Sequence, residues 1–317
     1  MHILVVGGGM GGTILANNLA RRLSGELEQG SSKITMLSAS DKHMYQPGLL
    51  YVAVGKMSTT ELYRDQKSLL EPSIDFHVDP VEKFDLDNNS VTTKSGKKVS
   101  YDILCIATGS RGNAAGIPGL AEHACQFYTE ADALAMYKKL QKFEGGKVVV
   151  ATGVPHKCPM SPLEITFFLI DYFKKRGIWD KVDLHYTYPI GRVHSLEPVA
   201  NWAAPEFDKE GVTYETLFNM KEVVPGKVIS EEDSSAEFDL LVTVPPHKGQ
   251  QVIEDNELGA GGFIPTDKKK LNMEGRENVF VLGDTTNLPI SKAGSTAHFE
   301  AEALGEHADR RLERVDT

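Results

Sequence analysis

The segment HILVVGGGMGGTILANNLARRL, residues 2–23, decides the class of fold. The mostly apolar residues before the glycines predict a buried strand, and the residues after them predict a helix. A second apolar segment, KITMLS at residues 33–38, predicts another buried strand. Strand, helix and strand form a β-α-β unit, which indicates that the chain begins with a parallel sheet.

The glycines between the first strand and the helix have the spacing Gly-x-Gly-x-x-Gly. Gly7 permits a sharp turn, Gly9 leaves room for a pyrophosphate, and Gly12 lets helix and strand approach closely. The phosphates would lie at the helix N-terminus, where unpaired N–H groups favour negative charge. The motif therefore predicts a dinucleotide site, with a turn that serves packing only as the alternative.

The composition is that of an ordinary globular protein of 317 residues, long enough for two domains. A net charge of −10 without a basic stripe argues against a nucleic-acid partner. No apolar run approaches the ~20 residues that span a bilayer, and the first strand leaves no room for a signal peptide. Cys105, Cys125 and Cys158 are too far apart to suggest a disulfide framework or a metal site. We expect a cytoplasmic protein, with peripheral attachment to the inner face of the membrane left open.

Later segments repeat the strand–turn–helix pattern. The segment around residue 147 begins a second such unit, and the segment NVFVLGDTT, residues 278–286, returns to the first sheet before a final helix at residues 295–312. The sequence predicts an α/β fold with two Rossmann-like domains. The first domain is discontinuous, residues 1–113 and 252–317, and the second, residues 114–251, is inserted into it.

Two further strand ends complete a flavin signature. Ala107, Thr108 and Gly109 close one strand, and Gly283 and Asp284 end the late strand. With the glycine motif, these segments resemble the two-dinucleotide-domain flavoproteins, the pyridine-nucleotide–disulfide oxidoreductase superfamily. The resemblance implies that the first domain binds FAD and that the carboxylate after the late strand contacts the ribitol.

The second strand departs from the superfamily pattern. It ends in Ser38, where an acid normally binds the adenosine ribose. A serine hydroxyl still bonds a ribose hydroxyl, although more weakly than a carboxylate does. Asp41 is expected to cap a turn.

The second domain lacks the glycine motif. After the strand KVVVA, its turn reads TGVPHKC, residues 152–158. Pro155 removes a backbone donor, and His156 and Lys157 carry side chains where backbone would approach phosphate. Binding of NAD(P)H in the usual mode is therefore disfavoured. No Cys-x-x-Cys or Cys-x₄-Cys pair supports thioredoxin- or glutathione-reductase chemistry.

The cysteine turn carries a narrower resemblance. The pattern Lys-Cys-Pro-x-x-Pro-x-Glu at residues 157–164 resembles the cysteine segment of sulfide:quinone oxidoreductases and of the flavoprotein subunit of flavocytochrome c sulfide dehydrogenases. The aromatic-x-Pro loop at residues 45–51, which contains Pro47, the strand end at residues 244–247 and the segment Lys292-x-Gly294 also resemble that family. The resemblance implies that Cys158 attacks or carries sulfur as a persulfide near the flavin.

The residue chemistry agrees with this role. Only a thiolate is a sufficiently soft nucleophile for sulfide oxidation. We expect the nearby helix N-terminus, with His156 and Lys157 adjacent in sequence, to lower the pKa of Cys158. Glu164 follows one to two helical turns later as a proton carrier, and Lys292 would stabilise a reduced, anionic flavin. The alternatives are an inert buried cysteine, a capping carboxylate and a surface lysine.

Other features differ from the family. The segment at residues 261–284 has no second cysteine, so a relay between two cysteines is not expected. Tyr128 stands where some members attach FAD through a cysteine, and Cys125 lies three residues earlier. After the final helix only a charged tail, residues 305–317, remains, so the resemblance implies neither a quinone site nor a membrane anchor there.

The sequence therefore predicts an FAD-dependent oxidoreductase of sulfide, persulfide or a small thiol. Its electron acceptor would be a quinone or a protein, and a homodimer or a partner subunit would complete the flavin's environment. Two alternatives remain: an NAD(P)H-dependent quinone or disulfide reductase, and a non-catalytic or electron-relay FAD subunit of a larger complex.

Overall fold

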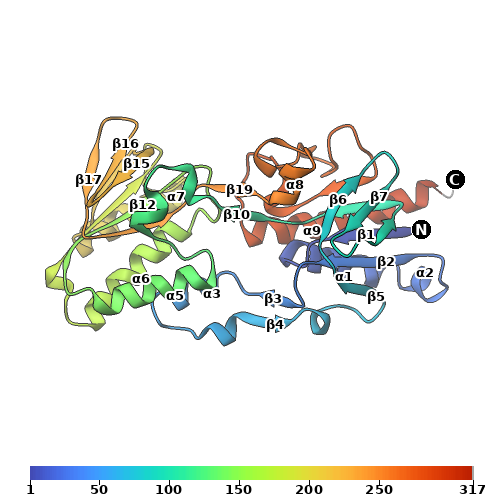
Figure 1. Ribbon diagram of the computed structural model, residues 1–317, viewed down its shortest axis with the longest axis horizontal. Helices are drawn as coiled ribbons and strands as arrows, with labels where there is room; N and C mark the ends of the chain where they lie inside the picture. Colours follow the sequence, from blue (N-terminus) through green and yellow to red (C-terminus); the bar gives the residue numbers. More distant parts are fainter. Residues whose placement is uncertain (316–317) are drawn as a thin grey trace. The chain divides into compact units, whose positions relative to one another are not determined.

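The chain divides into two compact units, each built on a parallel sheet (Figure 1). A computed structural model describes residues 1–315, with side chains through residue 306. Unit 1 comprises Met1–Met44, Tyr63–Arg111 and Lys248–Thr317, and unit 2 comprises Tyr45–Leu62 and Gly112–His247. The predicted α/β class with Rossmann-type sheets is confirmed.

Unit 1 contains a five-stranded sheet in the order β20-β9-β1-β2-β5. Every neighbouring pair in it is parallel. The strands are β1 (His2–Val6), β2 (Lys33–Ser38), β5 (Ile74–Val78), β9 (Ile103–Ile106) and β20 (Val279–Val281). The sequence places β1, β2, β9 and β20 in this sheet, because each is an apolar run followed by glycine or small polar residues.

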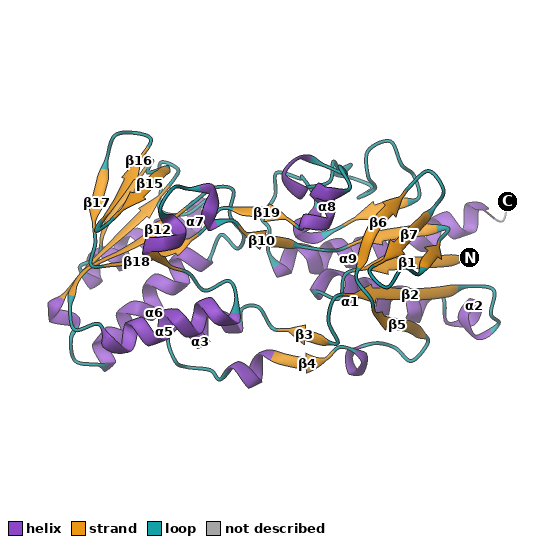
Figure 2. Cartoon of the chain, viewed as in Figure 1, coloured by secondary structure: helices purple, strands orange, loops and turns teal. Residues whose placement is uncertain are grey.

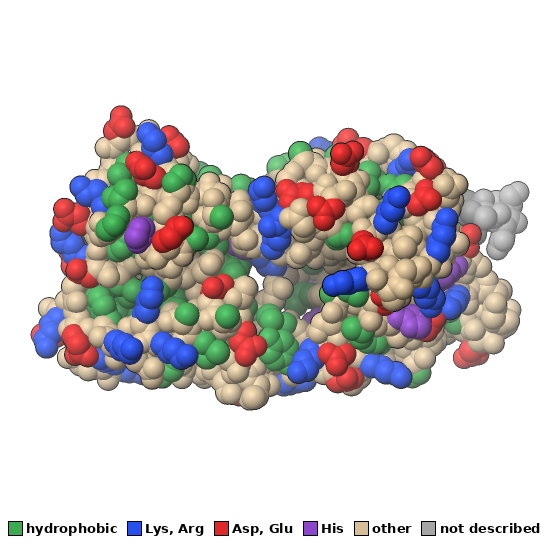
Figure 3. Space-filling model, viewed as in Figure 1, with side chains coloured by type: hydrophobic (Ala, Val, Ile, Leu, Met, Phe, Trp, Pro, Cys, Tyr) green, Lys and Arg blue, Asp and Glu red, His purple; other side chains and the backbone are tan. Residues whose placement is uncertain are grey.

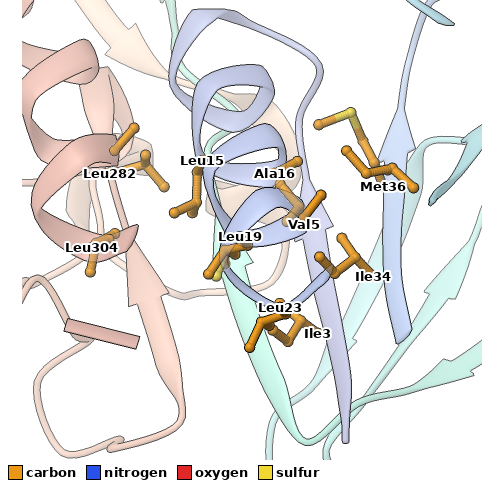
Figure 4. Close-up of a cluster of buried hydrophobic side chains, with 14 of the residues drawn as sticks. Ile3, Val5, Leu15, Ala16, Leu19, Leu23, Ile34, Met36, Leu282 and Leu304 are labelled. Carbon is orange, nitrogen blue, oxygen red and sulfur yellow. The ribbon is translucent and has the colours of Figure 1, made fainter. Parts of the chain in front are cut away.

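Helices α1 (Met10–Arg22) and α9 (Gly294–Val315) cover one face of this sheet. Apolar residues at helical spacing, Leu15, Leu19 and Leu23, belong to one buried cluster with the sheet residues Ile3 and Ile34 (Figure 4). Leu282 and Leu304 close the cluster from the late strand and from α9. This shared core fixes α1, and hence the glycine turn before it, relative to β1.

A small antiparallel sheet lies over the other face of the unit 1 sheet. It consists of β6 (Val81–Asp85), β7 (Ser90–Thr93) and β8 (Lys98–Ser100). The sequence predicts such a meander from residue 75, but β5 instead pairs in parallel with β2 as the edge of the main sheet. The remaining elements of unit 1 are α2 (Ser24–Glu28), β3 (Lys42–Met44), β4 (Tyr63–Asp65) and α8 (Gln251–Asp255).

Unit 2 repeats this plan with a parallel sheet in the order β11-β18-β12-β13-β14 (Figure 2). The strands are β11 (Ala124–Cys125), β12 (Gly146–Thr152), β13 (Val182–Tyr188), β14 (Thr213–Thr216) and β18 (Leu240–Val244). An antiparallel meander packs on the sheet: β15 (Met220–Val224), β16 (Lys227–Ser230) and β17 (Ser235–Glu237). The helices are α4 (Leu120–His123), α5 (Glu130–Lys142), α6 (Ser161–Lys175) and α7 (Glu197–Glu210).

Residues 45–62 belong to unit 2, although the predicted first domain includes them. Their helix, α3 (Gly48–Ala53), packs against α5 and α6. A Cβ atom at Gly55 would lie 2.3 Å from the ring of Tyr137, and Lys56 Nζ lies 2.7 Å from Asp171 Oδ2. The sequence does not predict that residues 45–62 pack in unit 2, because the helices that contact α3 lie about 80 to 120 positions later.

Besides the two ends of residues 45–62, the chain passes between the units at β10 (Ser110–Gly112) and β19 (His247–Gly249). The predicted charged tail, residues 305–317, falls mostly on side chains outside the described residues; the backbone of α9 is helical through Val315. Within the described part of the chain, no helix is long and apolar enough to span a bilayer. On the face drawn in Figure 3, acidic and basic side chains are interspersed.

Truncation of Leu15 tests the shared core of unit 1. Its side chain is 1% exposed, so Leu15→Ala is expected to lower the free energy of unfolding by about 2–5 kcal/mol. Leu69→Ala, at a residue that is 38% exposed, is the matched control and is expected to cost less than half as much. Urea unfolding measures both variants; equal losses would contradict the packing described here.

Candidate functional site

The predicted FAD-binding residues of unit 1 gather at one edge of its sheet. Strands β20, β9, β1 and β2 are neighbours and run parallel, so the loops after them meet at the carboxyl edge. This edge collects nine of the predicted residues: Gly7, Gly9, Gly12, Ser38, Ala107, Thr108, Gly109, Gly283 and Asp284.

Glycine is needed at the three motif positions for different structural reasons. A Cβ atom at Gly7 would lie 2.3 Å from Ala107 O, and one at Gly12 would lie 2.0 Å from Gly7 O. Both glycines are therefore required by the packing of strand, turn and helix. A Cβ atom at Gly9 would meet nothing within 4 Å. No described protein atom fills the space beside Gly9, as expected where a pyrophosphate approaches the backbone.

The N-terminus of α1 is suited to a phosphate. Gly9 is its N-cap residue and supplies no side-chain cap, and the first turn contains no acidic side chain. The first N–H groups of the helix are thus available to an anion, and the helix dipole favours negative charge there. The residues of this loop fit the pyrophosphate of a dinucleotide cofactor.

Polar contacts fix the carboxylate after β20. Asp284 is 7% exposed, and Ser110 Oγ donates to its Oδ2 at 2.9 Å. Thr285 Oγ1 accepts a hydrogen bond from Gly109 N at 2.7 Å and lies 3.3 Å from Thr108 Oγ1. These contacts join the ends of β9 and β20, the two segments predicted to bind the flavin side of FAD.

Glu300, which the sequence analysis did not single out, supports the same turn. Its Oε2 accepts a hydrogen bond from Gly283 N at 2.5 Å. Its Oε1 is buried without a hydrogen-bond partner among the described residues, and burial raises the pKa of the carboxyl. An orphaned buried oxygen beside a cofactor loop is a position where a ligand or a water supplies the missing donor. Among the several acids of the final helix, no sequence signal distinguishes this one.

Lys292 lies in the same neighbourhood of unit 1. Its Nζ donates to Thr286 O at 2.6 Å and stands 4.5 Å from the centroid of the Phe263 ring. Burial lowers the pKa of the ammonium group, whereas the carboxylates of Asp284 and Glu300 raise it. A half-buried cation is thus held near the predicted ribitol carboxylate.

Two predicted cofactor residues lie elsewhere or are differently constrained. Ser38 is the last residue of β2. A Cβ atom at Gly8 would lie 2.6 Å from its Oγ, so the hydroxyl packs against the glycine turn. Pro47 belongs to unit 2, where it is the exposed N-cap residue of α3. Pro47 thus belongs to a different unit from the other predicted cofactor residues, and its role toward FAD stays a prediction.

The cysteine turn occupies the corresponding position in unit 2, between β12 and α6. A Cβ atom at Gly153 would lie 2.5 Å from Pro246 Cδ, so this glycine serves packing. The turn is anchored by a hydrogen bond of 2.6 Å from His247 N to Pro155 O. Cys158 has a left-handed backbone, φ +58°, and the Cys158 carbonyl receives the N–H of Ser161 at 3.1 Å.

The expectation that Cys158 has a lowered pKa is wrong for the protein alone. Burial raises the pKa of the thiol, and the charge of Glu164 raises it further. The N–H groups of Ser161 and Met160 act in the opposite direction but are weaker. Lys157 does not compensate, because its Nζ donates to Gln46 Oε1 at 2.6 Å. Desolvation therefore outweighs the helix N-terminus.

Glu164 and Cys158 share one electrostatic environment. Glu164 is an exposed residue, and partial burial of its carboxyl group raises the pKa of that group above the ordinary value. An acid with a raised pKa beside a thiol with a raised pKa is a suitable pair for proton transfer.

The hydrogen bond between Lys157 and Gln46 connects the cysteine turn with the aromatic-x-Pro loop, two segments that are far apart in sequence. Gln46 lies in the predicted aromatic-x-Pro loop, and the excursion of residues 45–62 carries that loop into unit 2. Tyr51 and Phe168 add a ring contact of 5.0 Å between α3 and α6. The loop and the cysteine turn are thus neighbours within one unit.

Comparison with known proteins agrees with this arrangement. A family model for pyridine nucleotide-disulphide oxidoreductases matches residues 1–153. The mitochondrial sulfide:quinone oxidoreductase of Dictyostelium discoideum is 28% identical over 321 residues, covering 95% of this chain and 69% of that protein. The chain is a homologue of the sulfide:quinone oxidoreductases. Like these homologues, it is a flavin-dependent oxidoreductase with FAD as cofactor.

The similarity in fold extends over nearly the whole chain. The solved structure of the Aquifex aeolicus sulfide:quinone oxidoreductase superposes with a TM-score of 0.85 at 23% identity, covering 99% of this chain and 77% of that one. A Type II NADH:quinone oxidoreductase of Staphylococcus epidermidis is 23% identical over 337 residues, covering 99% of this chain and 82% of that protein.

Substitution of the motif glycines separates cofactor binding from folding. Gly9→Ala places a methyl group in open space, so the apoprotein is expected to keep its stability, while FAD binding weakens about 10- to 100-fold through overpacking against the pyrophosphate. Gly12→Ala, the control, is expected to destabilise the apoprotein itself, because its Cβ would meet Gly7 O. Thermal melts of the apoproteins and FAD titrations provide the two readings. Retention of full FAD affinity by Gly9→Ala would argue against this site.

The Cys158–Glu164 pair predicts a pH dependence. The pKa of Cys158 is raised above its ordinary value, so its alkylation by iodoacetamide is expected to remain slow at neutral pH and to accelerate in alkaline solution. Glu164→Gln removes a negative charge that disfavours the thiolate, and therefore shifts the profile toward lower pH. Peptide mass spectrometry follows the rate, with Glu144→Gln as the control at an exposed acid. A profile unchanged by Glu164→Gln would show that the two groups are uncoupled.

Proposed function

We propose that the protein oxidises sulfide, or a small thiol or persulfide, and passes the electrons through FAD to a quinone or a protein acceptor. Cys158 is the nucleophile that carries the sulfur. The observation that carries this proposal is the replacement of a glycine-rich dinucleotide loop in unit 2 by a turn that presents a cysteine at a helix N-terminus. Homology to sulfide:quinone oxidoreductases supports the same reaction class.

The proposed step balances as a two-electron oxidation. One S–S bond forms between Cys158 and sulfide, and the two S–H bonds of the reactants release two protons and two electrons. FAD, when bound, supplies the two-electron acceptor. Glu164 receives a proton from the thiol or from the sulfide, because burial raises the pKa of its carboxyl above the ordinary value and so strengthens it as a proton acceptor.

The sulfur then has to leave Cys158. The segment before β20, residues 261–278, contains no cysteine that would take it, and Cys105 and Cys125 are buried in strands of their own units. We propose that a second sulfide or a low-molecular-weight thiol attacks the persulfide. Its S–S bond forms as the bond to Cys158 breaks, which regenerates the thiol without a further change in electron number.

An NADH-dependent quinone reductase is the second candidate. The Type II NADH:quinone oxidoreductase among the relatives favours it. The turn of unit 2 speaks against it, because Pro155 lacks an N–H group and the loop carries the side chains of His156 and Lys157 where a pyrophosphate would approach. A non-catalytic FAD subunit is the third reading, and the Cys158–Glu164 pair is the feature that speaks against it.

Anaerobic titration of the holoenzyme tests the proposal. Sulfide is expected to bleach the oxidised flavin absorbance, and Cys158→Ser is expected to lose at least about 100-fold in the bleaching rate, since a hydroxyl is a far weaker nucleophile for sulfur than a thiolate. Cys125→Ser, at a buried cysteine, is the control for loss of a thiol as such.

The other outcomes of this titration choose among the rivals. Bleaching by NADH, with none by sulfide, would replace the proposal by the NADH-dependent reductase. Equal bleaching of the Cys158→Ser and unsubstituted enzymes by sulfide would remove Cys158 from the mechanism. Absence of any reaction with either donor would favour an electron-relay subunit. The cytoplasmic or peripheral location and the oligomeric state remain predictions from sequence.

A further inference from the structure

The backbone of Cys158 adopts a conformation that a side chain opposes. Its φ of +58° lies in the left-handed region, where Cβ crowds the following carbonyl oxygen. A non-glycine residue is held there only when its surroundings impose the conformation, and such positions are common at functional sites. The question is which groups of unit 2 impose it.

Two hydroxyl groups hold the peptide carbonyls on both sides of this residue. Tyr128 Oη donates to Lys157 O at 2.9 Å, and Ser161 Oγ donates to Cys158 O at 2.8 Å. The two hydroxyl oxygens lie 2.6 Å apart, so either one is able to donate to the other. Because each hydroxyl has a single proton, two protons serve three contacts, and the group behaves as one network.

Both hydroxyls are fixed by what surrounds them. The ring of Tyr128 stacks on Phe127 at 5.1 Å and meets His247 edge to face at 4.5 Å. Ser161 is 2% exposed and begins α6. Packing therefore holds the two hydroxyl groups in position, and these in turn hold the carbonyl groups of residues 157 and 158.

We propose that Tyr128 and Ser161 are positioning residues, a hydroxyl clamp that holds the turn so that the sulfur of Cys158 faces the N-terminus of α6. Tyr128 acts through the backbone of the turn, whereas Ser161 acts both through the backbone and through its hydroxyl near the sulfur. Neither residue needs to touch the substrate. The inference rests on the proposed function only in taking Cys158 as the reacting residue.

The clamp has a chemical consequence for the thiol. The N–H groups of Ser161 and Met160 and the Ser161 hydroxyl lower the pKa of Cys158 against the larger effect of burial. Hydrogen bonds to a thiolate depend strongly on distance and direction. A turn that loosens by a few tenths of an ångström loses this help, while desolvation remains.

Alkylation of the thiol tests the clamp without reference to sulfide. Cys105 and Cys125 are buried, so Cys158 is the accessible cysteine among the described residues. In the holoenzyme, with iodoacetamide as probe, Tyr128→Phe is expected to slow alkylation of Cys158 by about three- to tenfold below its pKa, the value of one net hydrogen bond. The pH profile should shift toward higher pH. Tyr137→Phe, at a tyrosine of α5 whose ring lies against Gly55, is the matched control and should leave both the rate and the pH profile unchanged.

A double-mutant cycle shows whether the two hydroxyls act as one network. Ser161→Ala should slow alkylation on its own, and the Tyr128→Phe, Ser161→Ala double variant should be close to the slower single variant rather than to the product of both effects. Independent, multiplying effects, or an unchanged profile in Tyr128→Phe, would overturn the proposal.

The strain at Cys158 provides a second measurement should Ser161→Ala fold poorly. Glycine tolerates a left-handed backbone, so Cys158→Gly should melt at a higher temperature than Cys158→Ala. That difference should shrink in the Tyr128→Phe background, where the turn is able to relax. The opposite order, or a difference that Tyr128→Phe leaves unchanged, would also overturn the proposal. Failure of the proposed function is separate: sulfide turnover that survives Cys158→Ser removes the reaction, whereas the alkylation rates still report on the clamp.

Discussion

The close approach of Gly12 to the carbonyl of Gly7 is the contact on which the rest of unit 1 depends. A methyl group at Gly12 would lie 2.0 Å from that oxygen, so only glycine allows α1 to begin so near the end of β1. With the helix in this position, its uncapped first turn faces the carboxyl edge of the sheet. The same edge receives the ends of β2, β9 and β20, and the cofactor residues on those strands then require no further device to meet.

Sequence patterns predicted the parts of the structure that are local. The glycine turn and the apolar strands were predictable because the deciding residues are neighbours in sequence. The position of Cys158 in the turn between a strand and a helix was predictable for the same reason. The sequence did not reveal Glu300, because its partner Gly283 is 17 residues away and its chemistry depends on burial. Nor did it reveal that residues 45–62 pack with α5 and α6, because only the folded chain brings these segments together.

The electrostatics of the cysteine turn could not be predicted from neighbours in sequence. Lys157 directly precedes Cys158 and was expected to supply positive potential at the thiol, but its ammonium group donates a hydrogen bond to Gln46. Burial and Glu164 then determine the direction of the pKa change, and both are properties of the packed turn. A thiol with a raised pKa carries less thiolate at neutral pH than an ordinary cysteine does, and the thiolate is the nucleophilic form.

The interleaving of the two units determines the order in which they can be completed during synthesis. Unit 2 has all of its chain once residue 247 is available, although residues 45–62 must wait for α5 and α6. Unit 1 begins first and finishes last, since β20 and α9 supply the strand beside β9 and the helix beside α1. While unit 2 is being made, β9 lacks its neighbour and the apolar face of α1 lacks α9. The nucleotide-binding edge of unit 1 therefore still lacks β20 and α9 when all residues of unit 2, the cysteine turn included, have been synthesised.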